Sequence, residues 1–159
     1  MSFKSTQRTF TRIQVNTGSC KEVFPLLCPV RESEWIEGWE YEMLYSLSGY
    51  AEKDCVFSTP YHNDLSTIWQ ITQYDPINYA LEFVRFTQGE LIVKINISLK
   101  SIDQLTTKSI IQYQYTGLNE TQNSYINSTL EEEFEDQMNY WERAINYYLI
   151  TGQKMKRGG

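Results

Sequence analysis

Residue types that catalyse reactions or bind metals are few and scattered in this sequence. Its single histidine, His62, lies in a polar segment, residues 61–64, that is typical of a surface loop and supplies no nucleophile beside it. The three cysteines, Cys20, Cys28 and Cys55, lack the spacing of zinc ligands, which predicts free thiols and no metal site. The sequence also contains no glycine-rich phosphate loop. We therefore expect no cofactor.

One pair of charged residues leaves acid–base chemistry open. Glu82 and Arg85 lie on opposite faces of a predicted strand, residues 78–87, because side chains alternate along a strand. Whichever face is inward, one of the two charges points towards the interior or its rim. A buried charge is costly unless it has a partner or a polar ligand. The alternative is a charge at the end of the strand that reaches solvent.

Aromatic residues form the best candidate site. They make up 14% of the chain, as 4 Trp, 12 Tyr and 7 Phe. Rings with a polar group favour pockets and interfaces, but a β-rich core also enriches aromatic residues, and both explanations stay open. The candidate ligand-binding residues are Trp39, Tyr41, Trp69, Phe83, Arg85, Tyr113 and Tyr115 on predicted strands, and Phe134, Met138 and Trp141 on a predicted helix.

Seven predicted strands must position most of these side chains. Alternating apolar and polar residues place them at 8–15, 39–47, 54–60, 66–74, 78–87, 91–100 and 105–117. In the first strand we expect Phe10 and Val15 to point inward, together with either Arg12 or Ile13. In the second we expect one half-buried face, formed by Trp39, Tyr41, Met43, Tyr45 and Leu47.

Two short helices are predicted between the first and second strands. Ser19 and Glu22 have the spacing of a capping box, so a helix should begin near residue 20, and Pro25 should kink or shorten it. A proline at the start of residues 29–35 favours a second helical turn, which should end at Gly38.

A single long helix is predicted after the last strand, over residues 121–151. Apolar residues recur there at steps of three and four, and Gly152 is a natural stop. At 1.5 Å per residue this helix would be about 45 Å long, enough to cross a domain. The resulting order predicts an α+β domain in which the helix covers a curved antiparallel sheet of about seven strands. A twisted sheet cannot close on one helix everywhere, so a gap that could hold an apolar ligand is expected between them.

Length and charge narrow the classes of protein further. The 159 residues suit one domain, which we expect over residues 8–152, with loose tails at 1–7 and 153–159. The net charge of −6 disfavours nucleic acid as a partner. No apolar stretch is long enough for a membrane-spanning helix and no secretory signal is visible, so we expect a cytoplasmic protein without integral membrane association. The oligomeric state is not readable from the sequence.

An ordered set of motifs resembles a known family. The segment VFPLLCPVRESEWIEGW, residues 23–39, is similar to a signature of a bacterial group in the SRPBCC superfamily, the START-like, helix-grip proteins related to the birch-pollen allergen. Further agreement follows at residues 72–76, 83–85 and 141–149. The resemblance spans roughly residues 8–152 and implies a helix-grip fold with a deep hydrophobic cavity between the sheet and the long helix. It does not imply one activity, because the superfamily includes carriers, cyclases, hormone sensors and chaperone activators.

Three functions are therefore compared. The first is binding or carrying a small hydrophobic ligand, aromatic or acyl, in the cavity. The second is a polyketide cyclase- or dehydratase-like enzyme, which would need an inward acid–base pair such as Glu82 or Arg85 with a tyrosine. The third is a protein-interaction module with a filled interior. The resemblance also places Arg31, Glu32, Glu34 and Trp35 near the cavity wall, either as a gate or docking site or as a structural bracket.

Overall fold

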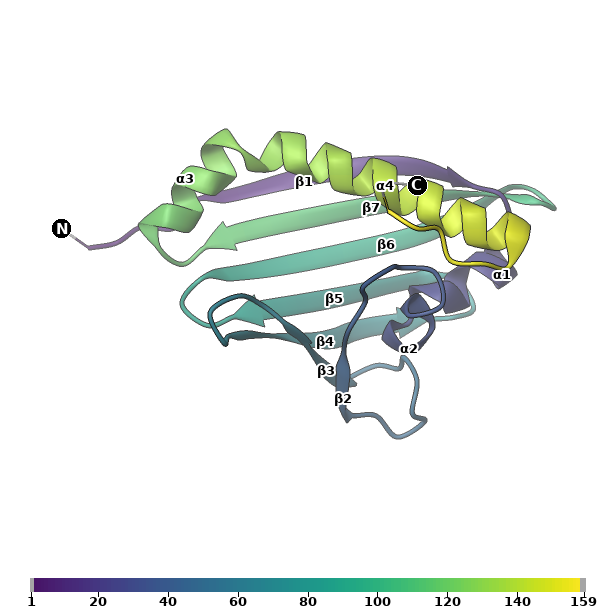
Figure 1. Cartoon of the computed structure of the whole chain (residues 1–159), viewed down its shortest axis with the longest axis horizontal. Coiled ribbons are helices and arrows are strands. Elements are labelled where there is room, and N and C mark those ends of the chain that lie inside the picture. Colours follow the sequence, from purple (N-terminus) through teal and green to yellow (C-terminus); the bar gives the residue numbers. More distant parts are fainter. Residues whose placement is uncertain (1, 158–159) are drawn as a thin grey trace.

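The computed structural model describes residues 2–157 and consists of one sheet, a group of short helices and two C-terminal helices (Figure 1). The strands are β1 (Gln7–Asn16), β2 (Glu42–Tyr45), β3 (Val56–Pro60), β4 (Ser66–Asp75), β5 (Ala80–Thr87), β6 (Leu91–Asp103) and β7 (Thr106–Gly117). The helical elements are α1 (Cys20–Val23), the 3₁₀ turn η1 (Phe24–Leu27), α2 (Pro29–Glu32), α3 (Glu120–Ser128) and α4 (Leu130–Thr151).

The seven strands form one antiparallel sheet in the order β1-β7-β6-β5-β4-β3-β2, with α4 lying across one face. This confirms the α+β prediction of a sheet around a long C-terminal helix. Along β6, the residues at every second position from Leu91 to Leu99 are buried beneath α4 or the short helices. On β5 the buried face contains Leu81 and Phe83, with Arg85 next on the same side.

The predicted strand 39–47 is wrong at both ends, because only Glu42–Tyr45 pairs with β3. After β2 the chain leaves the sheet in a turn that Glu52 organises. The Glu52 carboxylate accepts hydrogen bonds from the backbone N–H groups of Leu47 and Ser48, at 3.0 and 2.7 Å. Leu47, which was expected on the half-buried face, is consequently 83% exposed.

The inner face of β1 also differs from the prediction. Val15 and Ile13 are exposed, whereas Arg12 is half-buried and Gln14 is fully buried. The reason is that α4 packs on β1 through polar contacts as well as apolar ones. The Gln14 amide donates to the Met138 carbonyl (3.1 Å), and the Arg12 guanidinium pairs with Glu142 (3.0 Å).

A third polar contact lies one helical turn further along α4. The Asn146 side-chain oxygen accepts from the Asn16 side-chain amide and from the Thr17 backbone N–H, at 3.2 and 3.1 Å. Its own amide donates to the Val15 carbonyl. Together with Met138 and Glu142, Asn146 forms a row of attachment points to β1 at intervals of four residues.

The predicted long helix is interrupted once, at Thr129, which separates α3 from α4. The Ser128 hydroxyl donates back to the Ser124 carbonyl, a local bond that competes with the regular helix ladder. Upstream, α3 lies so close to the end of β7 that a Cβ at Gly117 would come within 2.4 Å of the Asn123 side-chain oxygen. Gly152, in the left-handed conformation, ends α4 as predicted.

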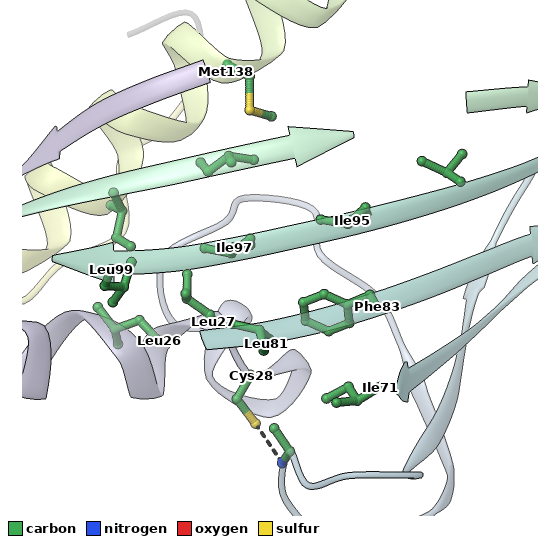
Figure 2. Packing of buried hydrophobic residues seen from close by; sticks show 14 of the residues in the cluster. Leu26, Leu27, Cys28, Ile71, Leu81, Phe83, Ile95, Ile97, Leu99 and Met138 are labelled. Carbon is green, nitrogen blue, oxygen red and sulfur yellow. Dashed lines mark hydrogen bonds between the residues drawn. The ribbon is translucent and has the colours of Figure 1, made fainter. Parts of the chain in front are cut away.

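The segment between β1 and β2 contains three short turns rather than two. The capping box of Ser19 and Glu22 is present, and Pro25 ends α1 after one turn and begins η1. Buried Trp35 fixes the return of this segment, because its indole N–H donates to the Leu26 carbonyl at 2.9 Å. Figure 2 shows the core on which this segment rests, with Leu26 and Leu27 drawn beside the β5 and β6 side chains.

Within residues 2–157, no helix is long and apolar enough to cross a membrane.

Candidate functional site

The sheet, α4 and the segment after α2 enclose a cavity of about 360 Å³, which we call the inner cavity. Its sheet wall is Phe57, Trp69, Phe83, Arg85, Ile95, Ile97 and Tyr113. Its helix wall is Gln137, Met138, Tyr140 and Trp141. The third wall is Glu32 together with residues 36–39, and Arg157 completes the lining.

A second cavity of about 580 Å³, the outer cavity, lies towards the start of α4. It is lined mainly by residues of α3, of the first two turns of α4 and of the loop that carries His62. Arg85 and Gln137 line both cavities and therefore mark the boundary between them.

Most of the predicted ligand-binding residues line one of the two cavities. The inner cavity brings together Trp39, Trp69, Phe83, Arg85, Tyr113, Met138 and Trp141. Tyr115 and Phe134 line the outer cavity instead. Tyr41 lines neither of these two, since it faces a surface groove beside Thr59 and stacks on Trp39 at 6.4 Å between ring centroids.

The aromatic wall is built around Trp69. Its ring stacks on Phe57 at 5.3 Å and meets Phe83 edge-on at 5.9 Å. Its indole N–H donates to the Thr59 hydroxyl at 2.9 Å, so its one polar group is already satisfied by the protein. Trp69 therefore offers a bound molecule an apolar, well-oriented ring face.

Arg85 is a cation without an ion-pair partner in this site. The ion pairs among residues 2–157 use Arg8, Arg12 and Arg31. The Arg85 guanidinium instead lies over the rings of Trp69 (5.4 Å) and Tyr115 (5.9 Å), and its buried Nε has no hydrogen-bond partner. The face of β5 left open by the sequence is thus settled, with Arg85 inward and Glu82 outward, where Glu82 accepts from the Thr72 hydroxyl at 2.7 Å.

Glu32 contributes a carboxyl group to the same cavity. Burial raises its pKa to about 8, because the charged form is poorly solvated there. Tyr113, whose pKa burial also raises, lies within electrostatic reach of both Glu32 and Arg85. The Tyr140 hydroxyl is buried without a hydrogen-bond partner. The inner cavity is thus lined by two carboxyl groups, two guanidinium groups and two phenols among aromatic and aliphatic side chains.

Glu32 was not among the predicted ligand-binding residues, and the sequence left its segment as a gate, a docking site or a bracket. The structure places the residues of this segment in different environments. Trp35 is fully buried against Trp141, at 5.0 Å in an edge-to-face contact. Arg31 and Glu34 pair with each other near the surface. The spacing of Glu32 and Ile36, one helical turn apart, is a signal that both line the same surface.

Residues 153–157 do not form the loose tail expected from the sequence. After Gly152 the chain folds back beside α4 (Figure 1). The Arg157 backbone N–H donates to the Glu37 carboxylate at 2.6 Å, and its guanidinium lies 4.2 Å from the Tyr140 ring centroid. The rest of the predicted tail, residues 158–159, lies outside the described residues.

Comparison of the whole structure with solved structures identifies the fold. Ara h 8.0201 superposes with a TM-score of 0.69 at 13% identity, covering 92% of this chain and 99% of its own. The ZhuI aromatase/cyclase from Streptomyces sp. R1128 gives 0.68 at 9% identity, with 94% and 100% covered. The chain has the helix-grip fold that these two structures share. Norcoclaurine synthase from Thalictrum flavum, in complex with dopamine and hydroxybenzaldehyde, shares this fold, with a TM-score of 0.66, 8% identity and 96% and 91% covered.

These likenesses establish the helix-grip fold alone, because the identities are low. No protein-family model matches the sequence, and no curated protein matches it. The chemistry of this helix-grip site therefore depends on its own residues. Cys20, Cys28 and Cys55 are buried free thiols, as expected, and His62 is exposed in its loop beside the outer cavity.

The aromatic wall makes a first prediction. Trp69→Ala is expected to weaken binding of an aromatic probe by more than tenfold, because it removes the stacking face between Phe57 and Phe83. Fluorescence titration with N-phenyl-1-naphthylamine measures the effect. Leu99→Ala is the control, since Leu99 is buried on the same sheet outside both cavities. If both variants lose stability but neither loses probe affinity, Trp69 is only a core residue.

Proposed function

We propose that the protein binds a small aromatic or acyl molecule that carries an anionic group. The apolar part occupies the inner cavity and the anion contacts Arg85. The observation that carries this proposal is the unpaired Arg85 guanidinium, held over two rings at the boundary of the two cavities with a buried Nε that lacks a partner. A ligand carboxylate beside the guanidinium would supply the missing counter-charge.

The apolar part of the ligand is supported by the size and lining of the inner cavity. Its volume of about 360 Å³ lies within the range of small-molecule sites, roughly 300–1,000 Å³. Phe57, Trp69, Phe83 and Met138 offer ring faces and aliphatic surface without free polar groups of their own. Among the solved structures with this fold, norcoclaurine synthase binds two aromatic molecules, dopamine and hydroxybenzaldehyde, and this is the only support that the comparisons give to the proposal.

An acid–base enzyme is the second candidate, and one observation favours it. Glu32 and Tyr113 line the same cavity, so a carboxyl and a phenol converge there. A carboxyl with a pKa near 8 suits a general acid at neutral pH. This pair differs from the Glu82 and tyrosine pair considered from the sequence, because Glu82 points away from the cavity. The interaction module with a filled interior is disfavoured by the inner cavity itself.

Two fluorescent probes that differ in charge test the anion site. We expect 1-anilinonaphthalene-8-sulfonate to bind wild type, and Arg85→Met to weaken it by about tenfold or more, the value of one charge-assisted contact. The uncharged N-phenyl-1-naphthylamine should bind both proteins alike, since methionine preserves the apolar volume. Arg12→Met is the matched control, because it removes a cation that is already paired with Glu142. If Arg85→Met weakens the binding of both probes equally, the charge of Arg85 has no role in binding.

A further inference from the structure

Glu32 lines the inner cavity away from its boundary with the outer cavity, which Arg85 marks. The segment that leads into α2 rests on the far end of β5, where the Phe24 ring contacts Tyr74 at 5.4 Å and Tyr74 pairs with Leu81 across β4 and β5. Arg85 lies four residues further along β5, about 13 Å from Leu81 in an extended strand. Arg85 thus lies at the boundary of the two cavities, whereas Glu32, at the end of α2, lines the inner cavity alone.

Tyr113 lies on the same cavity wall as Arg85, one row of the sheet away. It shares a row with Phe83, through the pairs Phe83–Ile95 and Ile95–Tyr113. That row lies between the rows of Leu81 and Arg85. Both Glu32 and Arg85 lie within electrostatic reach of the Tyr113 hydroxyl group. The three polar side chains therefore line one cavity.

The protonation state of Glu32 decides what it offers a ligand. A carboxyl that stays neutral near pH 7 is a hydrogen-bond donor rather than an anion. An ionised Glu32 would repel a ligand anion held at Arg85, whereas a neutral one would not. The cavity therefore has a cationic donor at Arg85 and a neutral donor at Glu32.

We propose that the ligand is an aromatic or acyl acid with an uncharged oxygen acceptor, such as a ketone, at the end away from its anionic group, and that Glu32 donates a hydrogen bond to this acceptor. This inference rests on the proposed function, since it takes the anion to be at Arg85. It adds the second functional group and the residue that selects it. Unsubstituted aromatic or fatty acids would leave Glu32 without a partner and bind less tightly.

Other charged or titratable groups also face the inner cavity and must be separated from Glu32. They are Glu37 in the segment after α2, Arg85 on β5, Tyr113 on β7, Tyr140 on α4 and Arg157 beyond α4. A comparison of wild type with Glu32→Gln isolates Glu32, because glutamine keeps a donor at this position but cannot ionise.

The test uses two probes, 6-acetyl-2-naphthoate and 6-isopropyl-2-naphthoate, which differ only in the acceptor. We expect wild type at about pH 6.5 to prefer the ketone by roughly three- to tenfold, the range of one hydrogen bond. Glu32→Gln should keep most of this preference and Glu32→Leu should lose it. Raising the pH to about 9 should reduce the ketone affinity of wild type by up to tenfold, but not that of Glu32→Gln.

Each result of this titration has a defined meaning. A ketone preference that persists in Glu32→Leu, or affinity of wild type that is independent of pH, overturns the role of Glu32. If both naphthoates bind, and Arg85→Met weakens both, the anion site stands even when Glu32 has no effect. If neither naphthoate depends on Arg85, the proposed function itself fails. Circular dichroism of the leucine variant shows whether it is folded before its affinities are compared.

Discussion

Glu32→Gln is expected to stabilise the protein increasingly as the pH rises from about 4.5 to 8. The folded-state pKa of Glu32 is raised from 4.5 to about 8, so the folded protein retains a proton that the unfolded chain releases in this window. Stability therefore falls with rising pH in wild type, and glutamine removes this loss. The full shift would correspond to about 4–5 kcal/mol, and we expect roughly 2–3 kcal/mol at pH 8 because the cavity opens to solvent.

Urea unfolding of both proteins across this pH range measures the difference in the free energy of unfolding. The two proteins should be nearly equal in stability at about pH 4.5, below which both states are protonated. Glu40→Gln is the control, since it makes the same change at an exposed position outside both cavities. A constant difference between wild type and Glu32→Gln over the whole range would show that Glu32 ionises freely in the folded state.

Trp35→Ala is expected to have the largest effect of any single substitution on the site. Trp35 is fully buried, donates to the Leu26 carbonyl and packs edge-on against Trp141. The substitution should lower the free energy of unfolding by about 3–5 kcal/mol, which is typical of a buried tryptophan changed to alanine. It should also weaken ligand binding, because Trp35 holds the segment that positions Glu32 and Trp39.

Trp35→Phe separates the two contributions of this side chain. Phenylalanine keeps much of the ring packing but cannot donate to Leu26, so we expect a smaller loss, about 1–2 kcal/mol. Chemical unfolding gives the stabilities, and titration with N-phenyl-1-naphthylamine gives the affinity of the residual folded protein. Retention of full probe affinity by Trp35→Ala would show that the segment is positioned independently of this residue.

Strands with one buried face and one face towards solvent were predictable from the sequence. In β6, buried apolar and outward polar residues alternate from Val93 to Lys100, and the structure follows this pattern. The errors occur where hydrogen bonds rather than apolar burial decide the conformation. Gln14 is buried because its amide reaches the Met138 carbonyl. Residues 46–52 leave the sheet because Glu52 accepts backbone hydrogen bonds.

The lining of the inner cavity was predictable in its aromatic residues and in Arg85, but not in Glu32. Trp69 and Phe83 line the cavity because inward positions of a covered sheet must be apolar. Glu32 could not be assigned in the same way, because charged residues on a short helical turn are usually solvated. Glu32 reaches the inner cavity only because residues 24–39 fold back over the sheet. Similarly, the unpaired state of Arg85 depends on three-dimensional neighbours that no sequence spacing reveals.

The attachment of α4 to β1 has a mechanical consequence. Its polar attachment points, at Met138, Glu142 and Asn146, lie beyond the first two turns of the helix. Those first two turns, up to Gln137, contact β1 through the exposed Arg8–Glu131 ion pair at 3.6 Å and through ring packing of Phe134 on Phe10. This first part of the helix, which follows the break at Thr129, lines the outer cavity. On the side of the outer cavity, α4 is therefore held to β1 by fewer polar contacts than along the rest of its length.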